Sequence, residues 1–242
     1  VYVLEPESDE LLVETSADWH HRRAVLKALF PTNVLSRYAL YDIDGGYIQR
    51  STTDNTSFEQ ARFEVLGHRW VDISQYDHGV CILNDGKYGH CVKGNTIEMT
   101  LLKAGIYPDF CVDEGHHEFK YSIHLHGKQD VIDFYKKADK LNNPVKVYKG
   151  NLKEPKLQIR IEPENFKVLS VRKVNKKVYL RVLECTGSSG DVSIDFLTNG
   201  LNFKKVSLVN ALEDLIGDLN VVDNTVNIPA EPFKFYTISV EL

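Results

Sequence analysis

Histidine pairs are the first residues in this sequence whose types and spacing could do chemistry. Two imidazoles lie close together at His20-His21, His116-His117 and His124-x-His126. On a strand, His124 and His126 would point to the same face, which is the geometry that a zinc pair requires. A third ligand at a suitable spacing is not evident. We therefore interpret these residues as exposed histidines at strand ends and predict no metal ligand in the chain.

Carboxylates are the second candidates, because glycosidases place two of them on either side of the bond they cut. Six acids lie in predicted loops: Asp72, Asp77, Asp85, Asp109, Asp113 and Glu114. Their spacing selects no two of them as an acid–base pair. The sequence also has no G-x-S-x-G elbow, no glycine-rich phosphate loop before a helix and no cysteine with a recognisable partner. We therefore predict no catalytic residue in this chain.

Residues 61–95 combine aromatic rings with Asp, Asn, Arg and Lys more densely than any other part of the sequence. Sugars call for flat apolar contact together with directional hydrogen bonds, so this mixture is typical of a carbohydrate site. An alternative is that Trp70 and Phe63 fill the core while Arg62 and Asp72 pair locally. The spacing alone does not decide between these two interpretations.

Short strands must position these residues. A two-residue period predicts strands at 10–17, 25–30, 37–43, 60–65, 79–83, 95–102 and 118–125. Apolar residues spaced by three and four predict one helix over 129–141, which Asn142-Asn143-Pro144 ends. Residues 151–156 are expected to form a linker. A second group of strands follows at 157–161, 167–174, 177–184, 191–197, 204–209, 225–228 and 233–241, the number expected of a small sandwich.

The composition limits which partners and which cellular location the chain is expected to have. The formal net charge of −5, from 29 basic and 34 acidic residues, gives no reason to expect nucleic acid. No apolar run reaches the length of a membrane span, and the acidic residues 1–13 do not resemble a signal peptide. The four scattered cysteines are expected to be buried free thiols, with a Cys81–Cys91 bridge as the alternative. These features favour a cytoplasmic location, and the opening Val1 in place of Met suggests a fragment or a processed product.

Several ordered motifs resemble the glycoside hydrolase family 38 α-mannosidases. They are D-W-H-H-R-R at 18–23, A-R-F-E-V at 61–65, H-R-W-V-D-I-S at 68–74 and G-V-C-I-L-N-D-G-K-Y-G-H at 79–90. Pro108-Asp109 and H-E-F-K-Y at 117–121 are similar to the family's P-D and H-E-F-T-Y segments. The resemblance is dense over 18–126 and looser from 157 onward.

The resemblance implies an all-β fold in three parts. Residues 1–127 would be the second half of a galactose-mutarotase-like central β-sandwich, 128–156 a helix and linker, and 157–242 a small C-terminal β-sandwich. Family members are zinc-dependent retaining enzymes, and their metal ligands and nucleophile lie in an N-terminal region. No position of this chain matches those residues, so zinc is expected in the parent enzyme and not here.

The role implied for this chain is to support the fold of an α-mannosidase and to shape its cleft. The candidate substrate-binding residues are Asn84, Asp85, Lys87 and Tyr88 in a turn, then Arg62, His68 and Arg69. The expected partners are the N-terminal catalytic region and a mannose-containing glycan, with homo-oligomers left open. One alternative is a stand-alone carbohydrate-binding sandwich with Trp70, Tyr76 and Tyr88 as its platform. Another is a pure assembly module.

Overall fold

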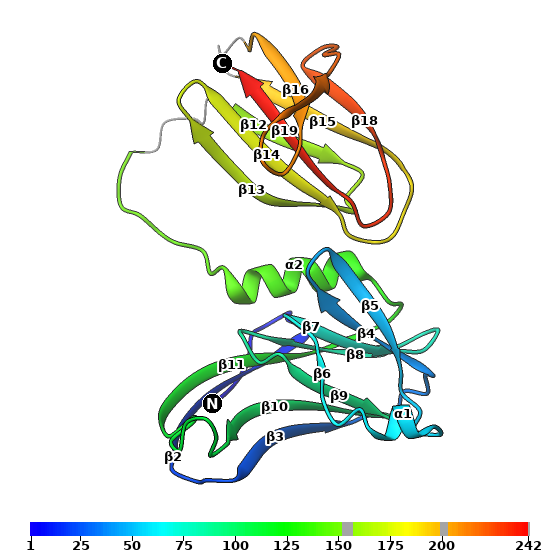
Figure 1. The fold of residues 1–242 in the computed structure, drawn as a ribbon, viewed down its shortest axis with the longest axis vertical. Helices are drawn as coiled ribbons and strands as arrows, with labels where there is room; N and C mark the ends of the chain where they lie inside the picture. Colours follow the sequence, from blue (N-terminus) through cyan, green and yellow to red (C-terminus); the bar gives the residue numbers. More distant parts are fainter. Residues whose placement is uncertain (152–156, 199–202, 242) are drawn as a thin grey trace. The chain divides into compact units, whose positions relative to one another are not determined.

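The computed structural model describes residues 1–151, 157–198 and 203–241. These residues form two compact units, Val1–Lys146 and Val147–Leu242, and each unit is built mainly of strands (Figure 1). Every strand pairing among the described residues is antiparallel. None of the helices in this part of the chain has the length and apolar character that crossing a bilayer would take.

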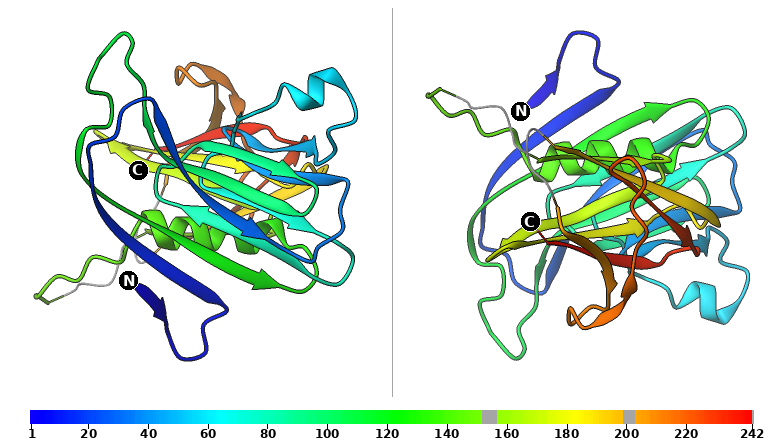
Figure 2. Two further views of the ribbon diagram at one scale, coloured as in Figure 1. Left: turned by 90° about the horizontal axis from the view of Figure 1, so that it is seen from below. Right: turned by 90° about the horizontal axis from the view of Figure 1, so that it is seen from above.

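The first unit contains two sheets. The larger sheet has the order β1 (Tyr2–Leu4), β2 (Glu10–Trp19), β11 (Gly115–His126), β8 (Gly79–Asn84), β7 (Trp70–Ser74), β4 (Tyr38–Ile43) and β5 (Gly46–Ser51). The smaller sheet has the order β3 (Ala24–Pro31), β10 (Thr96–Ala104), β9 (Gly89–Lys93) and β6 (Val65–Leu66). In the left view of Figure 2 the unit is seen from below, with the smaller sheet nearer the reader.

The core of this unit lies between the two sheets. Val71 and Ile73 of β7 and Ile82 of β8 pack against Ile97 and Met99 of β10, and all five side chains are fully buried. Successive residues of a strand point to opposite faces, so these residues define the inner face of the larger sheet. Burying large apolar side chains in this way supplies most of the stabilisation of such a sandwich.

Helix α2 (Val131–Asn142) covers the outer face of the larger sheet, on the side away from the smaller sheet (Figure 1). Trp70 is fully buried there, with its ring centroid 5.4 Å from the rings of both Phe134 and Tyr135. The helix begins at Asp130, whose carboxylate accepts hydrogen bonds from the backbone N–H groups of the first turn. The outer face therefore forms a second buried layer, and it contains polar residues as well as Trp70.

The second unit is a smaller sandwich. One sheet has the order β12 (Leu157–Glu162), β15 (Gly190–Thr198) and β18 (Thr225–Ala230). The other has the order β13 (Phe166–Val174), β14 (Lys177–Glu184), β19 (Phe235–Glu241), β16 (Lys205–Val209) and β17 (Leu215–Asp218). Leu180 and Ile238 from the larger of these sheets meet Ile194 and Phe196 from the smaller in one buried core.

The all-β fold, the two sandwiches and the helix are confirmed, but one predicted strand is wrong. Residues 60–65 do not form a strand, because Ser57–Gln60 is a short helix, α1, and only Val65 enters β6. A capping box fixes α1, in which Thr56 and Glu59 satisfy each other's backbone N–H groups. Phe63 follows this helix and is 74% exposed, so it does not fill the core.

Other expectations need smaller corrections. Strands β1, β5, β7, β9 and β17 were not predicted. β7 and β9 are buried on both faces and show no alternation, β5 has no regular alternation of buried and exposed residues, and β1 and β17 are only three and four residues long. None of the four cysteines forms a disulfide, which excludes the Cys81–Cys91 bridge, and Cys111 is exposed while the other three are buried. The expected linker falls mainly on residues 152–156, outside the described residues.

Candidate functional site

The turn between β8 and β9 holds most of the predicted binding residues, and Asn84 builds it. The Asn84 side-chain oxygen accepts hydrogen bonds from the N–H groups of Gly86 and Lys87, at 2.9 and 2.7 Å. Its Nδ2 donates to the carbonyl oxygen of His68 at 2.8 Å. Asn84 is fully buried, so it holds the turn and cannot itself meet a ligand in solution.

Asp85 and Lys87 attach the turn to β11. The Asp85 carboxylate accepts a hydrogen bond from the backbone N–H of Lys120 at 3.0 Å. The Lys87 ammonium lies 4.3 Å from the centroid of the Phe119 ring, which is a cation–π distance. Both side chains are only partly buried, so they keep polar atoms at the surface beside the turn.

An exposed ring completes the site. The rings of His68 and Tyr88 lie 5.1 Å apart, and Tyr88 is 47% exposed. The Tyr88 carbonyl oxygen accepts from the Gly67 N–H at 3.1 Å, which fixes the turn beside His68. We call His68, Asp85, Lys87 and Tyr88 the turn surface. It offers an aromatic face beside an imidazole, a carboxylate and an ammonium group, a combination suited to sugar hydroxyls.

Arg69 lies next to this surface but points into the protein. Its guanidinium is 3.1 Å from the Asp42 carboxylate and 2.5 Å from that of Asp139, so it ties β4 to α2. Burial raises the pKa of Asp42, and the charge and hydrogen bonds of Arg69 oppose that rise. Arg69 therefore has a structural role among the described residues.

The structure does not bring Arg62 to the turn surface. Arg62 follows α1, and its carbonyl oxygen accepts from the Cys91 thiol at 3.6 Å. It lines a small pocket together with Glu59 and Arg50. Trp70, which was predicted as a platform residue, is buried under α2 and therefore cannot stack on a sugar. Tyr76 is 94% exposed.

The six acids predicted near loops all have hydrogen-bond or ion-pair partners, and Asp72 lies in β7 and not in a loop. Asp72 is buried and lies 2.8 Å from His126 Nε2, with hydrogen bonds from Ser74 and Gln129. The other five pair as follows: Asp77 with His78, Asp85 with Lys120 N, Asp109 with Cys111 N, Asp113 with Lys103 N, and Glu114 with Arg22. Hydrogen bonds and ion pairs of this kind hold backbone and side chains in place.

The residues that could hold a metal lie elsewhere in the unit. His124 and His126 do share one face of β11, with ring centroids 5.3 Å apart. The prediction that they are exposed is wrong for His124, which is buried. Asp9 and Asp133 offer carboxylate oxygens within 4.8 Å of a His124 nitrogen. Sequence reasoning missed both partners, because Asp9 lies 115 residues before His124 and Asp133 is on the helix that folds over the sheet.

Comparison with known proteins places the first unit in a family. Residues 1–111 match the family described as "Glycosyl hydrolases family 38 C-terminal domain". This chain contains a family 38 C-terminal domain. Mouse (Mus musculus) α-mannosidase 2C1 is 32% identical over 239 residues, which is 94% of this chain and 23% of that protein. α-Mannosidase G of Dictyostelium discoideum is 40% identical over 131 residues, 54% of this chain and 12% of that protein.

The fold agrees with the same family. A crystal structure of an α-mannosidase from Enterococcus faecalis V583 superposes with a TM-score of 0.78, at 20% identity, over 99% of this chain and 28% of that chain. The relatives and the solved structure are therefore much longer, because the match spans 23% of the mouse protein, 12% of the Dictyostelium protein and 28% of the solved structure. The similarity extends through both units, although the family description covers residues 1–111.

Proposed function

We propose that this chain is the non-catalytic C-terminal region of a zinc-dependent retaining α-mannosidase that hydrolyses terminal α-mannosides. The observation that supports the proposal is the match of 94% of this chain to 23% of an α-mannosidase. Retaining hydrolysis needs two carboxyl groups about 5–5.5 Å apart, one as nucleophile and one as acid. The six candidate acids here have partners within this chain, so we assign the reacting groups and the zinc to the N-terminal region of the parent.

Within the parent, the turn surface is the part of this chain that we expect to reach the substrate cleft. Asn84 and Asp85 fix the turn, and Lys87 and Tyr88 present an ammonium group and a ring at its outer side. A glycan would place a sugar face on Tyr88 and hydroxyl groups near His68. Because Cys81 and Cys91 are buried and form no disulfide, we also propose a reducing compartment such as the cytoplasm.

The test is Tyr88→Ala in a full-length enzyme that contains this chain. Losing one aromatic contact of about 1 kcal/mol should raise the KM for an α-mannoside roughly fivefold. Tyr76→Ala is the matched control, because Tyr76 is an exposed tyrosine in the turn between β7 and β8. If Tyr88→Ala and Tyr76→Ala both leave KM and kcat unchanged in a folded enzyme, the turn surface does not meet substrate.

A further inference from the structure

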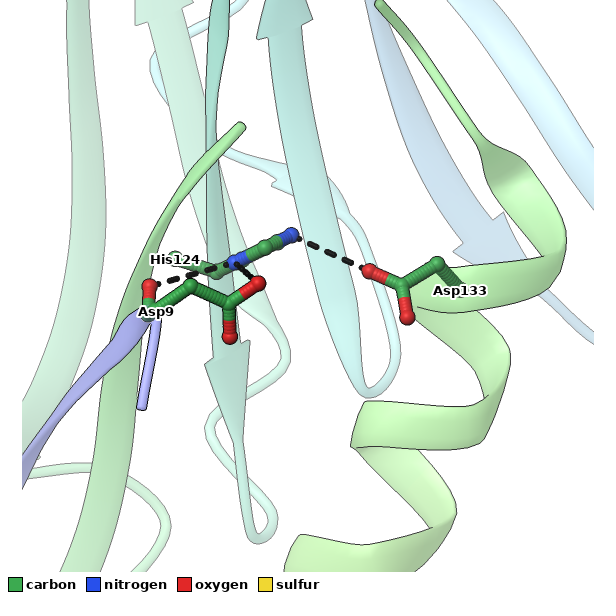
Figure 3. A group of neighbouring side chains, drawn as sticks. All are labelled: Asp9, His124 and Asp133. Carbon is green, nitrogen blue, oxygen red and sulfur yellow. Dashed lines mark hydrogen bonds and ion pairs between the residues drawn. The ribbon is translucent and has the colours of Figure 1, made fainter. Parts of the chain in front are cut away.

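A second polar group lies where the N-terminal segment, the larger sheet and the start of α2 meet (Figure 3). Asp9 precedes β2, His124 is near the end of β11, and Asp133 is in the first turn of α2. The His124 ring lies between the two carboxylates in Figure 3. One nitrogen of His124 and one oxygen of each aspartate all lie within 4.8 Å of one another. The proposed function uses none of these residues.

The surroundings of His124 leave one ring nitrogen for a ligand. The side chain is 2% exposed, and Nδ1 lies 3.3 Å from the Asp9 carbonyl oxygen. Nε2 is buried and has no hydrogen-bond partner among the described residues, although an Asp133 carboxylate oxygen lies 3.2 Å away. Histidines that bind metals usually donate the other ring N–H to a carbonyl or carboxylate, as Nδ1 can do here.

The separation of the two donor atoms suits a shared metal ion. Zinc lies about 2.0–2.2 Å from nitrogen and carboxylate ligands in a tetrahedral site, which puts two ligands about 3.4 Å apart. His124 Nε2 and Asp133 Oδ2 are 3.2 Å apart. The group also borders an open pocket of about 330 Å³, lined by Asp9, His124 and Asp133 among others. An ion could therefore enter from solvent, and water could complete its coordination.

The charge of the group also favours a cation. The carboxylates of Asp9, Glu10 and Asp133 share one ammonium, that of Lys137, at 2.6, 3.3 and 3.8 Å. These three carboxylates and one ammonium carry a net charge of −2, and Lys128, Asp130 and Lys136 also line the neighbouring pocket. A divalent ion would offset this negative charge.

We propose that Asp9, His124 and Asp133 bind one divalent transition-metal ion that fastens the N-terminal segment and α2 to the sheet. One imidazole and two carboxylates favour zinc, cobalt or manganese over calcium or magnesium, which prefer oxygen ligands alone. The competing explanation is that protonated His124 and Lys137 alone hold the three carboxylates together. The two explanations differ in their response to added metal.

The experiment is a calorimetric titration of zinc into the metal-free 242-residue chain, with unfolding temperature as a second readout. The proposal predicts one zinc per chain, a higher unfolding temperature with zinc, and at least tenfold weaker binding in Asp133→Asn and in Asp9→Asn. Both aspartates are substantially exposed, so these variants should fold, and circular dichroism would verify this. Lys137→Met should bind zinc more tightly, because it removes the neighbouring positive charge.

Two controls separate this group from weaker surface sites. Asp18→Asn alters exposed His20, which also lies between two carboxylates, those of Asp18 and Glu114. Cys111→Ser removes the exposed thiol. Neither variant should change the zinc affinity. The proposal is overturned if the wild-type chain takes up no zinc, if Asp133→Asn binds it equally well, or if Lys137→Met binds it more weakly. No outcome depends on α-mannosidase activity, so failure here would leave the proposed function standing.

Discussion

His90 should make the stability of the first unit depend on pH. It lies on β9, is fully buried, and burial lowers the pKa of its imidazole to about 4, opposed in part by the backbone of Lys87. In the unfolded chain the same group has a pKa of about 6.5. Between these values the unfolded state binds the proton more strongly. The stabilisation that comes from keeping His90 neutral and buried is therefore present above pH 6.5, and it is lost as the pH falls toward 4.

The size of this effect follows from the two pKa values. Each unit of difference is worth about 1.4 kcal/mol, so lowering the pH from 7.5 to 5 should cost about 2 kcal/mol from His90 alone. Urea unfolding at a series of pH values measures it, and tryptophan fluorescence reports on this unit because Trp19 and Trp70 are the two tryptophans of the chain. His90→Leu cannot take up the proton, so its unfolding free energy should fall by about 2 kcal/mol less than that of the wild type between pH 7.5 and pH 5.

Two results would refute this reasoning. One is an equal dependence of unfolding free energy on pH in the wild type and in His90→Leu. The other is an imidazole pKa for His90 near 6.5, read directly by NMR. His116→Gln is the control for replacing a histidine, because His116 is exposed on β11.

Three further predictions concern packing and buried charge. Trp70→Ala should lower the unfolding free energy of the first unit by about 3–5 kcal/mol in urea, because it leaves a cavity beneath α2. Arg69→Ala should cost about 3 kcal/mol in the same assay by leaving Asp42 buried without its partner, and a loss below 1 kcal/mol would contradict the structural role of Arg69. Glu184→Gln should destabilise the second unit by about 2 kcal/mol by circular dichroism. The buried carboxylate accepts from the N–H groups of Gly187 and Phe233, and an amide nitrogen cannot.

The fold could be predicted from the sequence where local patterns and tertiary packing agree. The apolar spacing over 129–141 predicted α2, which runs from Val131 to Asn142, and only the cap at Asp130 moved its start. The apparent alternation at 60–65 misled because Thr56 and Glu59 form a capping box just before it. That T-x-x-E signal is present in the sequence and should have predicted the helix.

The site was less predictable, because one residue can serve two purposes. Asn84 was predicted both as a turn residue and as a binding residue. Only the structure shows that its side chain is buried and that its amide group is hydrogen-bonded to the backbone of the turn and of His68. Arg69 has the charge of a ligand-binding residue, but its partners Asp42 and Asp139 are 27 and 70 residues away. Long-range pairing of this kind leaves no periodic trace in a sequence.

The most direct test of the central claim is hydrolysis of a chromogenic α-mannoside by the purified 242-residue chain, with added zinc and with a chelator. The proposal predicts no turnover above that of buffer in either condition, even if zinc binds beside His124. Turnover that requires zinc and disappears with the chelator would contradict it, and would mean that a complete catalytic site lies within this chain.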